Sequence, residues 1–416
     1  MRTIKGETYK ERLLLDFLRS PESIRSSCSA LMPFARQGQL KHFTYHEHAM
    51  AVTADFVIKL MLAQYPTLDI PYHSRMRHFN ADGIDRLGQL KQKVAGLEQT
   101  KSLIEVTMLS ILLDAGAGMQ WRYMDHVSNS ILSKSEGLAA ASYNLFMQGL
   151  FSSDPQNAQQ VDAAGLQKLT QNILAAGLQV TPKNPLVGLD GRVRLLQQVG
   201  ACIQQKPEYF GKDGDAVRLG NIISIWLEQT KDGILSIKVL FSTLLDAFSD
   251  IWPGRYSLSK INLGDVWPHN LNISTINPQG FIPLHKLTQW LCYSLIEPLE
   301  SYGLQITDID VLTGLPEYRN GGLFVDLEVL IPLEKNAFNI LHDLSSEFVV
   351  EWRAMTVVLL DELAHIIRAK LQLNAEQLPL IKILQGGTWL AGRKIASELR
   401  SDGSPPFKLI SDGTLF

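Results

Sequence analysis

The chain has 416 residues, of which 45% are hydrophobic and 19% are charged. This composition is typical of a globular protein and excludes disordered, collagen-like and coiled-coil chains. Its 39 Lys and Arg residues nearly balance its 42 Asp and Glu residues, so the chain lacks the basic excess expected of a nucleic-acid-binding protein.

Apolar residues recur every three or four positions along most of the chain, a spacing that predicts helices. The predicted helices lie at residues 46–65, 101–113, 137–150, 163–176, 187–204, 217–229, 233–248, 284–302, 345–371 and 388–400. Strand-like alternation is confined to 258–264, 280–283 and the last ten residues. We therefore expect one mainly α domain over residues 1–416; two lobes, 1–210 and 211–416, divided at the polar loop 205–216, are the alternative.

Cysteine usage and the N-terminus indicate a soluble cytoplasmic protein. The three cysteines are far apart and form no CxxC pair, which favours neither a disulfide framework nor a zinc ribbon. Charges are scattered through the first 20 residues, unlike a signal peptide. No apolar run reaches the ~18 uncharged residues of a membrane span. The chain also lacks Walker, complete GxGxxG, GxSxG and HExxH motifs, and these absences disfavour an NTPase, a dinucleotide enzyme or a serine hydrolase.

Three histidines, His42, His46 and His48, form the densest histidine cluster. In a helix, His42 and His46 would share one face at a spacing that suits a metal ion. No second compact ligand set accompanies them, so we expect hydrogen-bonded histidines rather than a metal site.

The segment 71–79 (PYHSRMRHF) interleaves two arginines and two histidines with aromatic residues. Arg75 and Arg77 could hold an anionic or sugar ligand, with a hydrogen bond from His73 or His78. The alternative is a basic surface turn that pairs with neighbouring acids.

The predicted helix 284–302 places Lys286, Gln289, Trp290, Tyr293 and Glu297 in one narrow stripe, with leucines over much of the remaining surface. A polar and aromatic stripe opposite an apolar face is typical of a pocket wall. The alternative is a solvent-facing surface that carries two aromatic rings.

The segment 312–326 (LTGLPEYRNGGLFVD) places a carboxylate, Glu317, directly after Pro316. The run Asn320-Gly321-Gly322 predicts a chain reversal or a close approach of backbone. Asp326 follows nine residues later, and Asp265 lies in an aromatic setting, GDVWPH. Paired carboxylates are what glycosidic cleavage requires; a capped turn with an arginine salt bridge is the alternative.

The segment 385–400 (QGGTWLAGRKIASELR) predicts a glycine turn that leads into a helix with Thr388 as its N-cap. A helix N-terminus beside Arg393 and Lys394 could hold a phosphate. An ordinary helix start is the alternative.

Several of these segments together resemble the bacterial and fungal uracil-catabolism family of the Urc pathway. The matching segments are HSRMRHF (73–79), LLDAGAGMQWRY (112–123), SEGLAAASYNLFMQGLFSS (135–153), NPLVGLDGRVRLL (184–196), GDVWPH (264–269), PLHKLTQWLCYSLIEPL (283–299), LTGLPEYRNGGLFVD (312–326), VVEWRAMTVVLLD (349–361) and GGTWLAGR (386–393). The resemblance covers nearly the whole chain, with Met76 where a bulky aromatic residue is expected.

A remoter resemblance, over about 35 residues, is to the queuosine-salvage nucleotide N-glycosylases. Those enzymes carry a Lys, a Gln three residues later and a downstream acidic-Tyr-Arg turn, which Lys286, Gln289 and Glu317-Tyr318-Arg319 match. Glu317 stands where Asp is expected, so its reach could differ. This resemblance implies a helical fold akin to helix-hairpin-helix DNA glycosylases.

The resemblances imply a hydrolase of uracil breakdown that cleaves an N-glycosidic or ureido bond in a ribosylurea-type intermediate, with or without a 5′-phosphate. Glu317 would stabilise the oxocarbenium-like state or activate water, with Asp265 or Asp326 as the second acid. The implied substrate-binding residues are His73, Arg75, Arg77, Trp121, Tyr123, Lys286, Gln289, Trp290, Arg319 and Arg393. Among these, the two tryptophans and Tyr123 would stack on the ureido or base portion, and Arg75, Arg77 and Arg393 would hold the phosphate.

No metal or organic cofactor is expected, because carboxylates suffice for this chemistry. The expected partners are a small ribosyl or ribosyl-phosphate ligand and, through the pathway, other uracil-catabolism enzymes; neither a nucleic-acid polymer nor a membrane is expected. Two alternatives stay open: a non-catalytic partner that passes an unstable intermediate between enzymes, and a metal-dependent amidohydrolase that uses the histidine cluster.

Overall fold

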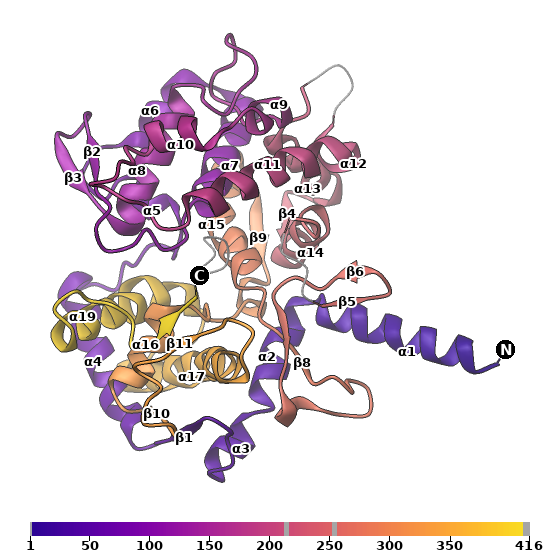
Figure 1. Cartoon of the computed structure of the whole chain (residues 1–416), viewed down its shortest axis with the longest axis vertical. Coiled ribbons are helices and arrows are strands. Elements are labelled where there is room, and N and C mark those ends of the chain that lie inside the picture. The colour runs from indigo at the N-terminus through magenta and orange to yellow at the C-terminus, as the bar shows by residue number, and fades with distance from the viewer. Residues whose placement is uncertain (1, 212–215, 252–255, 411–416) are drawn as a thin grey trace. The chain divides into compact units, whose positions relative to one another are not determined.

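The computed structural model describes residues 2–211, 216–251 and 256–410 (Figure 1). Parts of the predicted boundary loop 205–216 and of the predicted C-terminal strand lie outside these residues. Contacts divide the chain into two compact units. Unit 1 comprises residues up to 73, residues 256–289 and residues 310–410. Unit 2 comprises residues 74–251 and 290–309, so the described part of the loop 205–216 lies inside unit 2.

Unit 1 is built on long helices with short strand pairs between them. Its helices are α1 (Arg2–Leu18), α2 (Pro21–Ser29), α3 (Met32–Arg36), α4 (Ala49–Gln64), α16 (Tyr318–Asp326), α17 (Glu347–Leu371), α18 (Leu380–Ile383) and α19 (Trp389–Leu399), with a π-helical turn, η4 (Leu384–Thr388), between α18 and α19. Its strands are β1 (Phe43–Tyr45), β5 (Ser257–Leu258), β6 (Ile261–Asn262), β7 (Val266–Pro268), β8 (Phe281–Pro283), β10 (Leu330–Pro332), β11 (Leu341–His342) and β12 (Lys408–Leu409). They pair as β1–β10, β5–β6 and β7–β8 antiparallel and β11–β12 parallel.

Helix α17 is the centre of unit 1, where it contacts α2, α4 and α16 (Figure 1). Its N-cap is Ser346, whose side chain accepts a hydrogen bond from the backbone N–H of Val349. Its C-cap is Gln372, which adopts a left-handed backbone conformation. Sixteen residues of α17 are buried, including two charged residues, Glu351 and Arg353. A buried ion on such a helix requires a partner.

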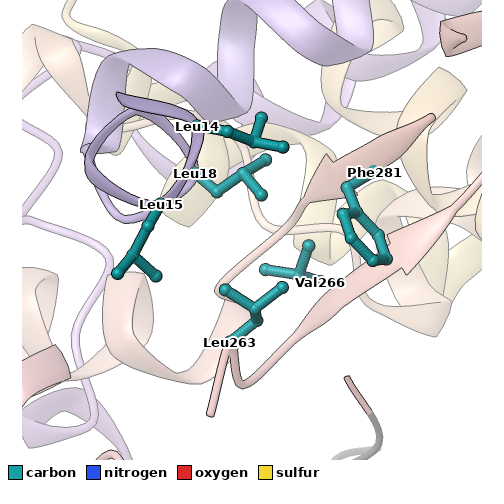
Figure 2. Close-up of a cluster of buried hydrophobic side chains, with 6 residues drawn as sticks. All are labelled: Leu14, Leu15, Leu18, Leu263, Val266 and Phe281. Carbon is teal, nitrogen blue, oxygen red and sulfur yellow. The ribbon is translucent and has the colours of Figure 1, made fainter. Parts of the chain in front are cut away.

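A cluster of buried apolar side chains packs α1 against the β7–β8 region. Leu14, Leu15 and Leu18 of α1 meet side chains from two nearby segments, as Figure 2 shows. Those side chains are Leu263, Val266 and Phe281. The α1 leucines follow the i, i+4 spacing of one helix face, which explains why this end of α1 is anchored.

Unit 2 packs helices around α7 (Gly96–Leu112), whose second half is buried on all sides. The other helices of unit 2 are α5 (Met76–Phe79), α6 (Arg86–Lys93), α8 (Lys134–Met147), α9 (Ala163–Gln167), α10 (Gln171–Gly177), α11 (Leu189–Gln205), α12 (Pro207–Phe210), α13 (Ile223–Gln229) and α14 (Ile237–Ala247). Its strands are β2 (Tyr123–Asp125), β3 (Ser130–Leu132), β4 (Ile234–Ser236) and β9 (Gln305–Thr307). Helix α7 contacts α8, and α9 contacts α11.

Helix α15 (Lys286–Tyr302) belongs to both units, because residues up to Gln289 lie in unit 1 and residues from Trp290 lie in unit 2. No helix of the described residues is both long enough and apolar enough to span a bilayer.

The mainly α architecture predicted from the sequence is confirmed. Each predicted helix is found, although 163–176 divides into α9 and α10 and the start of 233–248 is strand β4. The predicted strand 280–283 corresponds to β8, and 258–264 is a short hairpin, β5–β6. The N-terminal helices α1 to α3 were not predicted, because charged residues interrupt the apolar spacing of α1 and because α2 and α3 are short.

Candidate functional site

Glu317 is the N-cap of α16, and both of its carboxylate oxygens accept backbone hydrogen bonds. The N–H of Arg319 donates to Oε2 and the N–H of Asn320 donates to Oε1, each over 2.7 Å. The preceding Pro316 is buried, and the backbone at Glu317 is extended. The carboxylate is therefore held at the positive end of the helix dipole, with lone pairs left for a ligand.

Burial raises the pKa of Glu317 above its usual value, while the two backbone hydrogen bonds and the charges of Lys286 and Arg319 act in the opposite direction. Burial is the largest of these influences, so the shift is upward. A partly buried carboxylate with a raised pKa beside two cations is typical of an acid–base site.

The loop that leads to Glu317 is fastened to the first turns of α15. The fully buried Gln289 accepts hydrogen bonds from the backbone N–H of Thr313 (2.8 Å) and from its hydroxyl (3.2 Å). The amide nitrogen of Gln289 donates to the carbonyl of Leu284. Gln289 thus positions the loop, and the spacing from Lys286 to Gln289 brings both residues to the same end of α15.

Asp265 forms a buried, two-pronged ion pair with Arg353 of α17, with both N···O distances at 2.7 Å. Its carboxylate also accepts from the indole N–H of Trp267 (2.6 Å) and from the backbone N–H of Lys286 (3.0 Å). Although burial opposes this shift, Arg353 holds the pKa of Asp265 well below its usual range. Arg353 also donates from Nε to the carbonyl of Pro316. One ion pair therefore positions both Lys286 and the residue before Glu317.

Asp326 lies at the other end of α16 from Glu317. Nine residues at about 1.5 Å each separate the two along the helix axis, roughly 13 Å. The Asp326 carboxylate pairs with the Arg400 guanidinium at 2.8 and 2.5 Å. This separation is greater than the ~5–9.5 Å between the two carboxyl groups of glycosidases.

Of the two arrangements predicted for Asn320-Gly321-Gly322, the chain reversal is wrong, because the run is helical, and the close approach is found. The glycines permit this approach, because a Cβ on Gly321 would lie 2.8 Å from the Trp352 ring. Asn320 donates to the carbonyl of Leu315 and accepts from the hydroxyl of Thr388. These contacts fix the first turn of α16.

Helix α19 packs against α16 (Figure 1), and its approach depends on Gly392, where a Cβ would lie 2.2 Å from the carbonyl oxygen of Arg319. The expected glycine turn with Thr388 as N-cap is wrong. The chain is helical from α18 through η4 into α19, and Thr388 makes no capping hydrogen bond. Without a helix start there, the phosphate site expected at that N-terminus loses its basis.

His73 and Arg393 both lie beside Trp389. The guanidinium of Arg393 sits 4.8 Å from the Trp389 ring centre, and the His73 ring centre is 6.2 Å from it. His73 is buried and hydrogen-bonds Gln385 at 3.0 Å. Burial lowers the pKa of His73 to about 4, so its imidazole is neutral at pH 7. Unit 1 therefore contains His73, Asp265, Lys286, Gln289, Glu317, Arg319, Asp326 and Arg393.

The remaining expected site residues belong to unit 2. The segment 74–79 contacts the part of the α15 stripe that lies in unit 2, with Arg77 paired to Glu297 and the His78 ring 6.3 Å from Trp290. Trp290 and Tyr293 are buried, so this stripe is not a solvent face. Arg75 and Glu317 lie in different units, and a pocket shared by them stays a prediction.

The Trp121 and Tyr123 rings lie next to each other, with centres 6.3 Å apart. Trp121 is fully buried and donates its indole N–H to the carbonyl of Leu178. Tyr123 accepts a hydrogen bond from Asn144. These contacts favour a packing role for both rings.

The histidine cluster does not form the helical face that metal binding would use. Strand β1 separates His42 from His46, and the His46 and His48 rings stack on each other. Among residues 2–211, 216–251 and 256–410, no group of three His, Cys, Asp or Glu side chains is arranged to hold a metal ion.

The role of Arg353 was not predicted from the sequence. A signal for Arg353 was present, because two charged residues interrupt the apolar run VVEWRAMTVVLL. Its partner Asp265 is 88 residues away, and no local pattern reveals such a pair.

A family model described as a protein of unknown function (DUF1688) matches residues 17–416. The chain belongs to this family. Protein urg3 of Schizosaccharomyces pombe is 40% identical, over 96% of this chain and 98% of that protein. Uracil catabolism protein 4 of Lachancea kluyveri is 36% identical, over 97% of this chain and 99% of that protein. The expected family membership is confirmed over nearly the full length.

Proposed function

We propose that this DUF1688 protein takes part in uracil catabolism, and that it hydrolyses the bond between the sugar and the ureido nitrogen of a ribosylurea-type intermediate. The name of the Lachancea kluyveri relative supports the pathway. The observation that carries the reaction is the Glu317 carboxylate, held by two backbone N–H groups beside Lys286 and Arg319, with a raised pKa.

In the proposed reaction, water attacks the anomeric carbon while the bond to the ureido nitrogen breaks. Ionised Glu317 stabilises the positive charge that develops on the sugar and accepts a proton from the attacking water. The departing nitrogen takes up a proton, so ribosylurea and water give ribose and urea. Asp265 acts here by positioning Lys286 and the loop at Pro316, because its own carboxylate is paired with Arg353.

The test is the release of urea and free sugar from ribosylurea, with and without its 5′-phosphate. The wild-type protein is expected to release both products, and Glu317→Gln is expected to lose turnover while it still binds the ligand. Since Gln can still accept a backbone hydrogen bond, the cost to stability is expected to be only about 1 kcal/mol.

A matched control is Asp162→Asn, which removes the charge of another buried N-cap carboxylate, on α9 in unit 2. This variant is expected to keep full turnover. No release by the wild-type protein from either compound would overturn the hydrolase.

A non-catalytic carrier of the same intermediate is the second candidate. It is favoured by the two backbone hydrogen bonds at Glu317, which an N-cap with a purely structural role would also make. A carrier would bind ribosylurea and resist heat in its presence without releasing urea.

A further inference from the structure

In unit 2, residues from several elements converge on the fully buried guanidinium of Arg75. Its Nε donates to Ser110 at the end of α7 (2.9 Å), and its Nη1 donates to Ser135 of α8 (2.8 Å). Nη1 also lies 2.7 Å from Asp114 and 3.1 Å from His78. The backbone N–H of Arg75 donates to Ser294 of α15. The guanidinium is therefore held in one orientation.

The Nη2 group of Arg75 is buried and has no hydrogen-bond partner among the described residues. Nη2 carries two N–H donors, and leaving buried donors unsatisfied is costly. Arg77 and Arg86 also have buried nitrogens without partners, but at each it is the single Nε–H. Arg75 thus offers an unusually large unused donor capacity.

The carboxylate beside Arg75 is held equally firmly. Ser135 donates to both oxygens of Asp114, at 2.6 and 2.7 Å. The loop that carries Asp114 is clamped by the buried Arg192, which donates to the carbonyls of Leu113 and Ala115. Asp114 is 15% exposed, whereas Arg75 is inaccessible, so a ligand would enter from the side of Asp114.

The charges around this pair are balanced. The negative charges of Asp114 and Glu136 favour the charged form of Arg75, and the charge of Asp114 also favours the charged form of Arg192. Two carboxylates thus accompany two guanidiniums. A phosphate would add uncompensated negative charge here, whereas a neutral ligand would not. Adjacent N–H donors and a carboxylate acceptor match a group that has a carbonyl oxygen next to an N–H.

We propose that Arg75 and Asp114 form a binding site for a neutral ureido group. The ureido oxygen accepts from Arg75 Nη2, and the ureido N–H donates to Asp114. The choice of a ureido compound over other amides rests on the proposed function. This assignment replaces the expectation that Arg75 holds a phosphate.

The test measures binding by calorimetry in the Glu317→Gln background, where turnover is absent. The probes are ribosylurea, which has the ureido group, and ribose 5-phosphate, which has only the phosphate. Arg75→Lys is expected to weaken ribosylurea binding by about tenfold to a hundredfold and to leave ribose 5-phosphate binding unchanged. The control Arg86→Lys alters another buried arginine of unit 2 and is expected to change neither.

Equal losses for both probes after Arg75→Lys would overturn the inference in favour of a phosphate site. Unchanged binding would also overturn it, since water alone would then satisfy Nη2. Should Arg75→Lys fail to fold, Asp114→Asn gives the same comparison through the acceptor. Ribosylurea binding that depends on Arg75 without any urea release by the wild-type protein would refute the hydrolase and leave this inference standing.

Discussion

Asp265 connects several of the residues that surround Glu317 through its hydrogen bonds. It joins Arg353 of α17, Trp267 and the first residue of α15, all through hydrogen bonds no longer than 3.0 Å. Its low pKa keeps it ionised, so it cannot serve as a proton donor near neutral pH. In the proposed reaction, its role is to hold the groups around Glu317 in place.

We expect Asp265→Asn to lower the free energy of unfolding by about 3–5 kcal/mol, because it leaves Arg353 buried without its counter-ion. Urea release should also fall, by about a hundredfold if Lys286 and Glu317 move by ~1 Å. Asp125→Asn is the matched control, since Asp125 is buried and paired with Arg86 in unit 2. Chemical denaturation and turnover assays on both variants check this. Equal losses of activity in the two variants would contradict the prediction.

The raised pKa of Glu317 predicts the acidic limb of the pH–rate profile. In the proposed reaction the ionised carboxylate is the active form, so kcat/KM should fall as the pH decreases through a pKa above the ordinary value of 4.5. His73, with a pKa of about 4, is already neutral above that range. In the His73→Asn variant, kcat/KM should still fall at the same acidic pH, whatever the change in the maximal rate. If this acidic fall disappeared, the titrating group would be His73.

For single residues, the sequence predicted those features that depend on neighbouring residues in the chain. Pro316 followed by Glu317 identified a pre-positioned carboxylate, and the spacing of Lys286 and Gln289 placed both at the same end of one helix. The partners of Asp265 and Asp326, Arg353 and Arg400, lie 88 and 74 residues away, so their commitment to ion pairs could be seen only in the fold.

Among the elements, the pairing of α16 with α19 depends on a missing side chain. Gly392 brings α19 against the backbone of Arg319, and η4 inserts a wider turn just before α19 begins. Such π-helical turns are often found at functional sites. The two glycines of η4 predict a turn, since glycine permits both a turn and a helix. The helix is selected by packing against α4, a tertiary contact that the local sequence does not reveal.

Gly392→Ala should separate α16 from α19, because the new methyl group would lie 2.2 Å from the Arg319 carbonyl oxygen. We expect a loss of about 1–3 kcal/mol in stability and a fall in urea release, as the first turn of α16 moves. Gly165→Ala creates a similar clash, at 2.1 Å from the Phe151 carbonyl, within unit 2. If both variants lose stability but only Gly392→Ala loses turnover per folded molecule, the packing of α16 on α19 matters for the site. Equal turnover in the two would contradict this.

On the scale of the whole molecule, neither unit is a continuous stretch of chain. Within the described part of the chain, unit 1 is assembled from three stretches and unit 2 from two, and α15 contributes to both. Helix periodicity is a local property, so it predicted most helices correctly, but it contains no information on which helices share a core.

We therefore expect that the chain cannot be divided near residue 210 into folding halves. The fragment 1–210 would contain the start of unit 1 without α16, α17 and α19, and the fragment 211–416 would lack α7 and α8 of unit 2. Each purified fragment should show no cooperative thermal transition by circular dichroism. A sharp transition in either one would show that a contiguous half is self-sufficient.

Helix α15 also limits how the length of this protein can change. Gln289 faces the loop at Thr313, and five residues later Ser294 faces Arg75. One inserted residue between them would rotate Ser294 by about 100° about the helix axis relative to Gln289 and move it by about 1.5 Å along that axis. Insertions in a surface loop cost only a slow increase in closure entropy. We therefore expect relatives to keep the number of residues between Gln289 and Ser294 and to differ in length elsewhere.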